Sequence, residues 1–318
     1  YKPKTKDINI NYYSYLFSNP SFYKSLIRYC KGIMELRESL DKNDFKKLVL
    51  PFPKIGIQTK IVDFLDDKTT KIDEAISIKE QQINLLKERK RILIHKAVTR
   101  GLDDTVKLKD SGVEWIGEIP VRWEVKKLKY STKIFRGKFT HRPRNDERMY
   151  DGEYPFFQTG DVARAGKFLS AYKQTLNENG LRVSTLFPKG TIVITIAANI
   201  GDISILDIDA CFPDSIVGFE PNVFVEKDFL YNSLLVMKEQ FMSSTIKNTQ
   251  MNLNVDRIGS NSIVIPSIEE QKEISEYIET ASQKIETAIS LKQQEIAKLK
   301  EYKSSLINSV VTGKVKVC

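Results

Sequence analysis

The feature that most constrains this chain is a long helical pattern that occurs twice. Residues 71–94 are KIDEAISIKEQQINLLKERKRILI, and residues 284–307 are KIETAISLKQQEIAKLKEYKSSLI, an offset of 213 residues. At that offset, residues 53–99 and 266–312 share 20 identities over 47 positions without a gap. Each copy begins with a proline, which is a common start signal for a helix, and contains no other. The sequence therefore predicts two similar long helices separated by about 160 unlike residues.

Apolar residues recur in both copies at alternating steps of four and three, which is the pattern of a coiled-coil seam. A helix with one apolar stripe is unstable alone in water, so each copy needs a partner, and the other copy can supply it. At about 1.5 Å per residue, each helix would be roughly 60 Å long. A general dimerisation coiled coil would show the same heptads, so they predict pairing but no purpose. The predicted seam is Leu65, Thr69, Ile72, Ile76, Lys79, Ile83, Leu86, Lys90, Leu93 and Ala97, and then Ile278, Ser282, Ile285, Ile289, Lys292, Ile296, Leu299, Lys303, Leu306 and Val310.

Charge and cysteine usage narrow the class of protein. The net charge of +9 favours an anionic partner such as nucleic acid, although membranes and acidic proteins also fit charge alone. No apolar run approaches the roughly 20 residues needed to span a bilayer, and no signal peptide is expected. Cys30, Cys211 and Cys318 lie far apart without a CxxC pair, so neither a disulfide framework nor a zinc site is indicated. A cytoplasmic location is therefore expected.

Between the helices the sequence changes character. Glycines, prolines and aromatic residues appear, and short β-rich runs over residues 154–162, 190–206 and 214–222 indicate strands. A helix is expected over about residues 225–248. The length of about 150 residues suits one globular α+β domain.

Positive charge in this domain is concentrated in residues 121–150, which hold ten Lys or Arg and three acidic residues. Its centre is the stretch 134–145, IFRGKFTHRPRN, whose Gly and Pro indicate a loop. Lys and Arg neutralise phosphates, and Arg can also bond two acceptors on a guanine edge. The stretch therefore predicts contact with DNA, and a solvated basic loop is the alternative.

The N-terminal segment resembles the end of the same domain. A proline, a polar stretch and then Tyr-x-x-Leu occur in both, which pairs Tyr13 and Leu16 with Tyr231 and Leu234. The duplicated unit is therefore predicted to be a globule followed by a helix.

The order globule, helix, globule, helix, together with WIGEIPVRWEVKKL at residues 115–128, the paired Pro and Gln helix starts and the VT helix ends, resembles the specificity (S) subunit of type I restriction-modification enzymes. The resemblance covers nearly all of the chain. It implies an α+β fold in which globular target-recognition domains are joined by two long helices that pair as an antiparallel coiled coil. It implies a non-catalytic subunit that recognises one or both halves of a bipartite DNA target.

The same resemblance implies partners and boundaries. Methyltransferase (M) subunits, two of them, would dock on the helices, and motor/nuclease (R) subunits would complete the complex. Extrapolating the 213-residue period places the start of a first recognition domain about 100 residues before Tyr1, so most of that domain is expected to be absent. Self-association of the chain would then restore two-domain symmetry. The expected division is 1–52, the remnant of the first domain; 53–104, the first helix; 105–265, the second domain; and 266–318, the second helix.

Candidate DNA contacts are loop residues of the intact domain, since Gln and Asn can bond adenine bidentately and Lys can hold a phosphate. A turn or capping role is the alternative for each of them. The candidates are Arg136, Lys138, His141, Arg142, Arg144, Gln158, Thr159, Lys247, Gln250 and Asn252. The helices expected to dock the M subunits are marked by Ile72, Ile76, Ile83, Leu86, Ile285, Ile289, Ile296 and Leu299.

An enzyme has little support from the motifs. SNPSF at residues 18–22 only partly matches an adenine-holding N-P-P-(F/Y) loop, and FPDS at 212–215 lacks the acidic and lysine residues of a nuclease metal site. No glycine-rich nucleotide loop is present, and of the two histidines His95 is expected on the helix surface. No cofactor and no metal are therefore expected. The alternative function is a coiled-coil scaffold or adaptor without sequence-specific DNA recognition.

Overall fold

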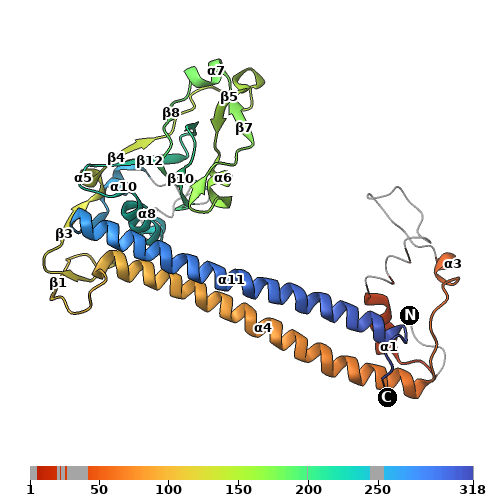
Figure 1. The fold of residues 1–318 in the computed structure, drawn as a ribbon. Coiled ribbons are helices and arrows are strands. Elements are labelled where there is room, and N and C mark those ends of the chain that lie inside the picture. The colour runs from red at the N-terminus through yellow and green to blue at the C-terminus, as the bar shows by residue number, and fades with distance from the viewer. Residues whose placement is uncertain are drawn as a thin grey trace. The chain divides into compact units, whose positions relative to one another are not determined.

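The structure is a computed structural model that describes residues 6–19, 22, 26, 42–198, 200–243 and 254–317. The chain divides into two compact units, which are described separately. Unit 1 comprises Tyr1–Lys87 and Ile285–Cys318, and unit 2 comprises Glu88–Lys284. Two long helices, α4 (Ile55–Arg100) and α11 (Ile268–Val311), contribute residues to both units (Figure 1).

These two helices are the repeated segments of the sequence. Helix α4 has 46 residues and α11 has 44, and each starts two residues after its proline. None of the 20 predicted seam side chains is exposed, because each is buried or half-buried. The heptad pattern therefore identifies the buried stripe of both helices correctly.

In unit 1 the stripes of α4 and α11 pack into one apolar cluster. Two of the seam lysines extend their Nζ atoms to a carboxylate on the other helix: Lys79 lies 2.7 Å from Glu295, and Lys303 lies 2.6 Å from Asp73. Residue numbers rise along α4 as those of the partners fall along α11, so the helices run in opposite directions here. The buried members of the cluster are Ile72, Ile76, Ile83, Ile285, Ile289 and Ile296.

The first turn of α4 contains a glutamine whose side chain bonds the backbone ahead of a short helix, α1 (Ile10–Ser18). The buried Gln58 accepts a hydrogen bond from Asn9 N at 2.8 Å. Its Nε2 donates to Asp7 O at 3.0 Å and to Pro53 O at 2.7 Å. Asn9 is the N-cap of α1, so this one side chain fixes the start of both helices.

Unit 2 contains the same arrangement around Gln271 of α11 and the helix α8 (Lys227–Val236). Gln271 accepts from Glu226 N at 2.7 Å and donates to Phe224 O at 3.0 Å and Pro266 O at 2.9 Å. Glu226 is the N-cap of α8. The two segments therefore fold alike around equivalent glutamines.

The residue correspondence between α1 and α8 is one position away from the sequence prediction. The N-caps Asn9 and Glu226 are 226 − 9 = 217 residues apart, so Tyr13 corresponds to Leu230 and not to Tyr231. The Tyr-x-x-Leu match was wrong by one residue because three tyrosines precede the leucine in α1, and the caps and glutamine bonds, not residue type, set the register. In this register Tyr12 corresponds to Phe229, and both side chains are buried.

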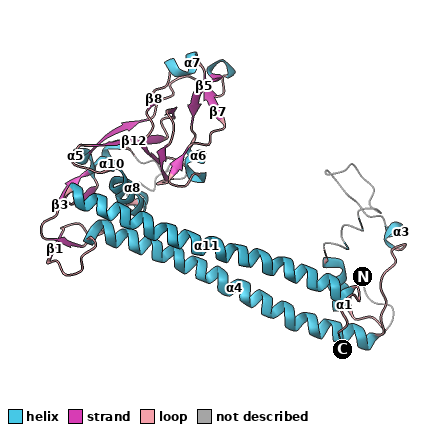
Figure 2. Cartoon of the chain, viewed as in Figure 1, coloured by secondary structure: helices cyan, strands magenta, loops and turns pink. Residues whose placement is uncertain are grey.

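The globular part of unit 2 is built on a five-stranded sheet of order β4-β12-β9-β10-β6 and a four-stranded sheet of order β7-β5-β11-β8, with two-stranded pairs β1-β2 and β13-β3 (Figure 2). The strands are β1 (Leu108–Asp110), β2 (Glu118–Pro120), β3 (Glu124–Lys127), β4 (Thr132–Arg136), β5 (Tyr150–Phe156), β6 (Phe168–Leu169), β7 (Gln174–Leu176), β8 (Leu186–Phe187), β9 (Ile192–Thr195), β10 (Ile203–Leu206), β11 (Ala210–Cys211), β12 (Ile216–Pro221) and β13 (Ser262–Ile265). Among the described residues, the remaining helix of unit 1 is α3 (Lys42–Phe45), and those of unit 2 are α5 (Leu128–Ser131), η2 (Glu147–Met149), α6 (Thr159–Arg164), α7 (Glu178–Arg182), α9 (Lys238–Ser243) and α10 (Val255–Ser260).

The central strand β9 is apolar on both faces because both faces are covered. Ile192 and Ile194 belong to the core that includes Leu230 and Leu234 of α8. Val193 points to the other side and joins a second core with Phe157 and Phe212. Alternating side chains of one strand thus connect two cores, as the period of two requires.

Lys167, just before β6, bonds this sheet to the helices of unit 2. Its Nζ lies 3.1 Å from Asp228 of α8 and 2.7 Å from Glu279 of α11. Burial works against its charge, but the two carboxylates more than compensate, so the pKa of Lys167 is raised. The bond from Lys167 in turn lowers the pKa of Glu279.

Three further expectations differ from the structure. The predicted strand over 154–162 ends at Phe156, because Gln158 caps α6 and the chain turns into a helix there. The helix expected over 225–248 is divided at Met237 into α8 and α9, and residues 244–248 lie outside the described residues. His95 is half-buried rather than on the surface, because its Nε2 bonds Trp115 O at 3.0 Å.

Across the described residues, the structure has no helix with both the length and the apolar character to cross a bilayer.

Candidate nucleic-acid interface

The predicted basic stretch leaves the sheet at the end of β4 and is held closely against the segment before β12. Gly137 N donates to Ile216 O at 2.8 Å, and Lys138 N donates to Phe212 O at 3.0 Å. A Cβ atom at Gly137 would lie 2.2 Å from Pro213 O, so only glycine allows this approach. The loop start is therefore fixed, and the side chains on both sides of it have defined positions.

Two of the candidate arginines share Asp214 from this segment. Arg136 Nε donates to Asp214 O at 2.7 Å, and an Nη atom of Arg144 lies 2.5 Å from the Asp214 carboxylate. The third, Arg142, donates to Phe139 O at 2.9 Å and His141 O at 2.8 Å. All three arginine side chains remain exposed, so these bonds orient the guanidinium groups and leave further N–H donors for a ligand.

Asp146 connects the basic loop to the short helix η2 that follows it. Its carboxylate lies 2.7 Å from His141 Nε2 and 2.7 Å from an Nη atom of Arg148, and it caps η2. The hydrogen bonds from Arg148 and then His141 hold the pKa of Asp146 far below its usual range. His141 is thus a partner of Asp146 within the loop.

Of the other candidate contacts, three belong to the residues that the structure describes and three do not. Gln158 is the N-cap of α6, where the Asp161 carboxylate accepts from Gln158 N at 2.8 Å, and half-buried Thr159 begins the helix. Lys138 is exposed and forms no ion pair within the described residues. Lys247, Gln250 and Asn252 lie outside the described residues.

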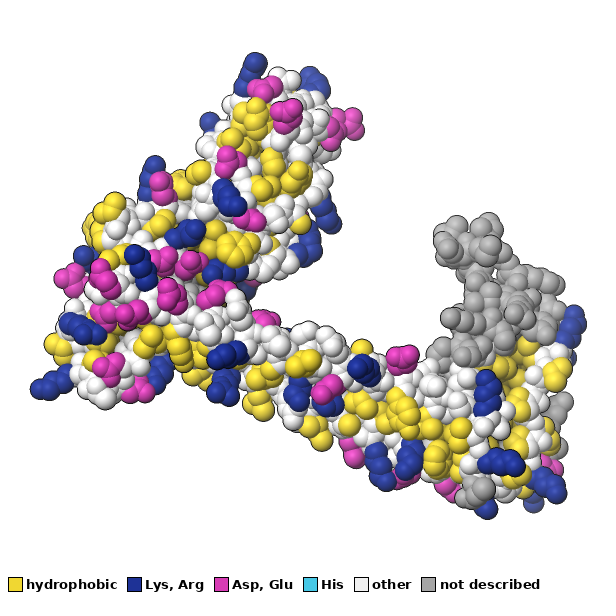
Figure 3. Space-filling model, in the orientation of Figure 1, with side chains coloured by type: hydrophobic (Ala, Val, Ile, Leu, Met, Phe, Trp, Pro, Cys, Tyr) yellow, Lys and Arg dark blue, Asp and Glu magenta, His cyan; other side chains and the backbone are white. Residues whose placement is uncertain are grey.

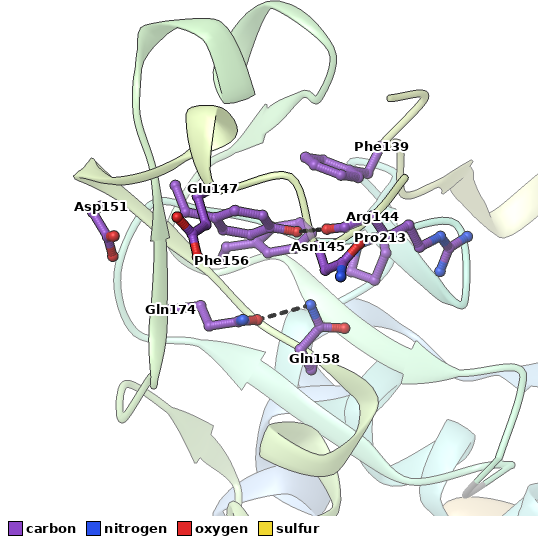
Figure 4. A pocket seen from close by; sticks show the side chains of 10 residues that line it. Phe139, Arg144, Asn145, Glu147, Asp151, Phe156, Gln158, Gln174 and Pro213 are labelled. Atoms are coloured by element: carbon purple, nitrogen blue, oxygen red, sulfur yellow. Dashed lines mark hydrogen bonds between the residues drawn. The ribbon is translucent and has the colours of Figure 1, made fainter. Parts of the chain in front are cut away.

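A pocket of about 420 Å³ adjoins the loop, and we call it the Tyr150 pocket (Figure 4). The Tyr150 hydroxyl donates to Arg144 O, and burial raises the pKa of this phenol. Gln158 Nε2 donates to Gln174 Oε1 at 3.2 Å. A register shift in β5 between Tyr150 and Tyr154 places Asp151 at a φ of 61° beside the pocket. The lining residues are Phe139, Arg144, Asn145, Glu147, Tyr150, Asp151, Phe156, Gln158, Gln174 and Pro213.

Arg144 and Gln158, two of the predicted contacts, line the same pocket, and Arg136 shares Asp214 with Arg144. The sequence pattern did not predict their partners. Asp214 lies in FPDS, which resembles a metal motif in sequence and serves here to hold two arginines. Gln174 carries no local signal, because the strand pairing of β5 and β7 brings it to the pocket. Basic side chains are interleaved with acidic ones on the face drawn in Figure 3 and do not form one continuous patch.

The eight residues expected to mark the docking helices belong to the cluster between α4 and α11. Their side chains pack on one another and are buried or half-buried. Because the opposite helix covers them, a partner protein would have to contact other faces of the same helices.

Comparison with known proteins places these features in a family. Residues 120–301 match the type I restriction modification DNA specificity domain. The chain is 24% identical over 318 residues to a putative type I restriction enzyme MjaX specificity subunit of Methanocaldococcus jannaschii, covering 99% of this chain and 70% of that protein. It is 25% identical over 291 residues to the MjaVIII specificity subunit of the same organism, covering 87% of this chain and 64% of that protein.

Two solved structures have a similar fold. One comes from a study of complex assembly and conformational transition of the type I R-M system, with a TM-score of 0.76, 15% identity, and coverage of 96% of this chain and 72% of that chain. The other is the HsdS subunit from Thermoanaerobacter tengcongensis, with a TM-score of 0.56, 15% identity, and coverage of 98% and 72%. The matched domain spans more than half of the chain, and the protein therefore belongs to the type I restriction-modification DNA specificity family.

Proposed function

We propose that this chain is the DNA sequence-recognition subunit of a type I restriction-modification complex. The observation that carries the proposal is the family match over residues 120–301, which includes the basic loop, the Tyr150 pocket and most of α11. The domain at 105–265 recognises a half-site of a bipartite target. Arg136, Arg144 and Lys138 supply base and phosphate contacts from the loop.

The two long helices act as the spacer between recognition modules and pair as an antiparallel coiled coil. Support comes from the isoleucine cluster and from the opposed ion pairs of Lys79 and Lys303. A lysine at a seam position fixes register at some cost in stability. Two half-sites on one duplex require a fixed protein spacing, and a stiff helix pair provides it.

Two M subunits dock on the outer faces of these helices. The support is the equivalence of the two helix starts, each built from a short helix, a proline and a buried glutamine. Equivalent surfaces in one chain can bind two copies of the same partner. The chain itself contributes recognition and no catalytic group, and R subunits complete the restricting complex.

Selection of DNA from a random pool tests the proposal. The purified chain is mixed with its cognate M subunit at physiological salt, and the retained DNA is sequenced. We expect a short enriched motif, and substitution of exposed Lys138 by Gln should weaken binding evenly across sequences and reduce the salt slope by about 0.9. A stable complex with M that enriches no sequence would instead support the scaffold alternative.

A further inference from the structure

The Tyr150 pocket combines aromatic and amide groups in one concavity. Tyr150 and Phe156 form its apolar part, with ring centroids 6.3 Å apart, and Tyr150 is the half-buried member of the pair. Pro213 contributes from the segment beside Asp214. The volume of about 420 Å³ is within the range of small-molecule sites.

The polar side of the pocket holds a pair of carboxamides, shown in the lower part of Figure 4. Their mutual bond uses the Nε2 donor of Gln158 and the Oε1 acceptor of Gln174. An amide oxygen has two lone pairs and an amide nitrogen two hydrogens, so the pair still offers an acceptor and a donor. These remaining groups can bond a ligand edge that carries one donor and one acceptor.

Charge around the pocket disfavours an anion. Glu147 and Asp151 are exposed carboxylates in its lining, and they repel phosphate but accept hydrogen bonds from amino groups. The one cation in the lining, Arg144, already faces the Asp214 carboxylate at 2.5 Å. The chemistry therefore fits an uncharged planar group with an N–H donor.

We propose that the Tyr150 pocket binds one nucleobase of the DNA, adenine or cytosine, turned out of the base stack. These two bases carry an amino group beside a ring-nitrogen acceptor, which matches the donor and acceptor of the Gln158–Gln174 pair. In guanine and thymine the corresponding exocyclic group is a carbonyl oxygen, which cannot donate to the Glu147 and Asp151 carboxylates of the lining. A base inside the stack exposes only its groove edges, so a base must leave the stack to reach an aromatic concavity.

This inference rests on the proposed function, because it assigns one position of the recognised sequence to one pocket. Gln174 is the informative residue, since it is exposed on β7 and is not a helix cap. The variant Gln174→Leu keeps the side-chain size and removes the amide. Asn179→Leu on α7 is the matched control, because it removes an exposed amide of the same domain that does not line the pocket.

The first readout is the sequence preference of the chain with its cognate M subunit after selection from a random pool. In Gln174→Leu we expect the preference for adenine or cytosine at one position to fall about 5- to 150-fold, the range of one bidentate contact, with the other positions retained. Asn179→Leu should enrich the wild-type motif unchanged.

The second readout is fluorescence of 2-aminopurine or pyrrolocytosine placed at that position, with the chain alone and no methyltransferase present. Emission should rise several-fold on binding of the wild-type chain, because unstacking relieves quenching, and it should not rise with Gln174→Leu. If the wild-type chain and Gln174→Leu enrich the same motif, and fluorescence of the base analogue does not rise when the wild-type chain binds, this inference is overturned and the proposed function still stands. Failure of the wild-type chain to enrich any motif would overturn both.

Discussion

The glutamine at the start of α11 provides the sharpest test of how this chain is held together. Gln271 is fully buried and makes three hydrogen bonds, to Glu226 N, Phe224 O and Pro266 O. The substitution Gln271→Ala removes all three and leaves one backbone donor and two backbone acceptors without this partner. Each buried bond contributes about 1 kcal/mol net, and each stranded group costs about 1–3 kcal/mol unless water replaces the amide.

With partial replacement by water, we expect Gln271→Ala to lower the free energy of unfolding of unit 2 by about 2–4 kcal/mol. Both tryptophans of the chain, Trp115 and Trp123, lie in unit 2, so urea unfolding followed by tryptophan fluorescence reports on this unit. At a typical slope of about 2 kcal/mol per molar urea, the midpoint should fall by about 1–2 M.

Gln283→Ala is the control, because it makes the same change at an exposed position of the same helix. Gln283 bonds Glu279 one turn away, an interaction worth about 0.2–0.5 kcal/mol, so its midpoint should move little. Equal midpoints for the two variants would refute the reasoning that Gln271 fixes the helix start.

Three further outcomes are expected. Gly137→Ala places a Cβ 2.2 Å from Pro213 O, so it should cost about 1–3 kcal/mol in thermal unfolding and weaken DNA binding, whereas Gly166→Ala, with no atom within 4 Å, should do neither. Asp214→Asn removes the charge facing Arg144, so competition binding should show weaker discrimination between target and random DNA with little loss of total affinity. The pKa of Glu279 is lowered in the folded state, so its pairing with Lys167 stabilises the fold at pH values above the unfolded pKa of about 4.3. This stabilisation is lost as pH falls through the folded pKa. The difference in free energy of unfolding between wild type and Lys167→Met should therefore be constant from pH 7 to 5 and shrink below about pH 4.3.

The sequence by itself determined the two long helices, their buried stripes and the family. Each of these depends on periodicity or on a repeated order of residues, which are properties of the chain taken locally. The seam positions from Leu65 to Ala97 and from Ile278 to Val310 are buried or half-buried for that reason. A period of alternating three and four residues leaves a helix only one apolar face to bury.

Tertiary structure alone decided what surrounds the candidate site. Asp214 meets Arg136 and Arg144 because β4 pairs with β12, and Gln174 meets Gln158 because β5 pairs with β7. The residue correspondence between α1 and α8, which differs by one position from the sequence prediction, also followed from hydrogen bonds to Gln58 and Gln271, not from matching side chains. Residues brought together across a sheet share no spacing along the chain, so strand order and backbone hydrogen bonding, rather than any local pattern, set their contacts.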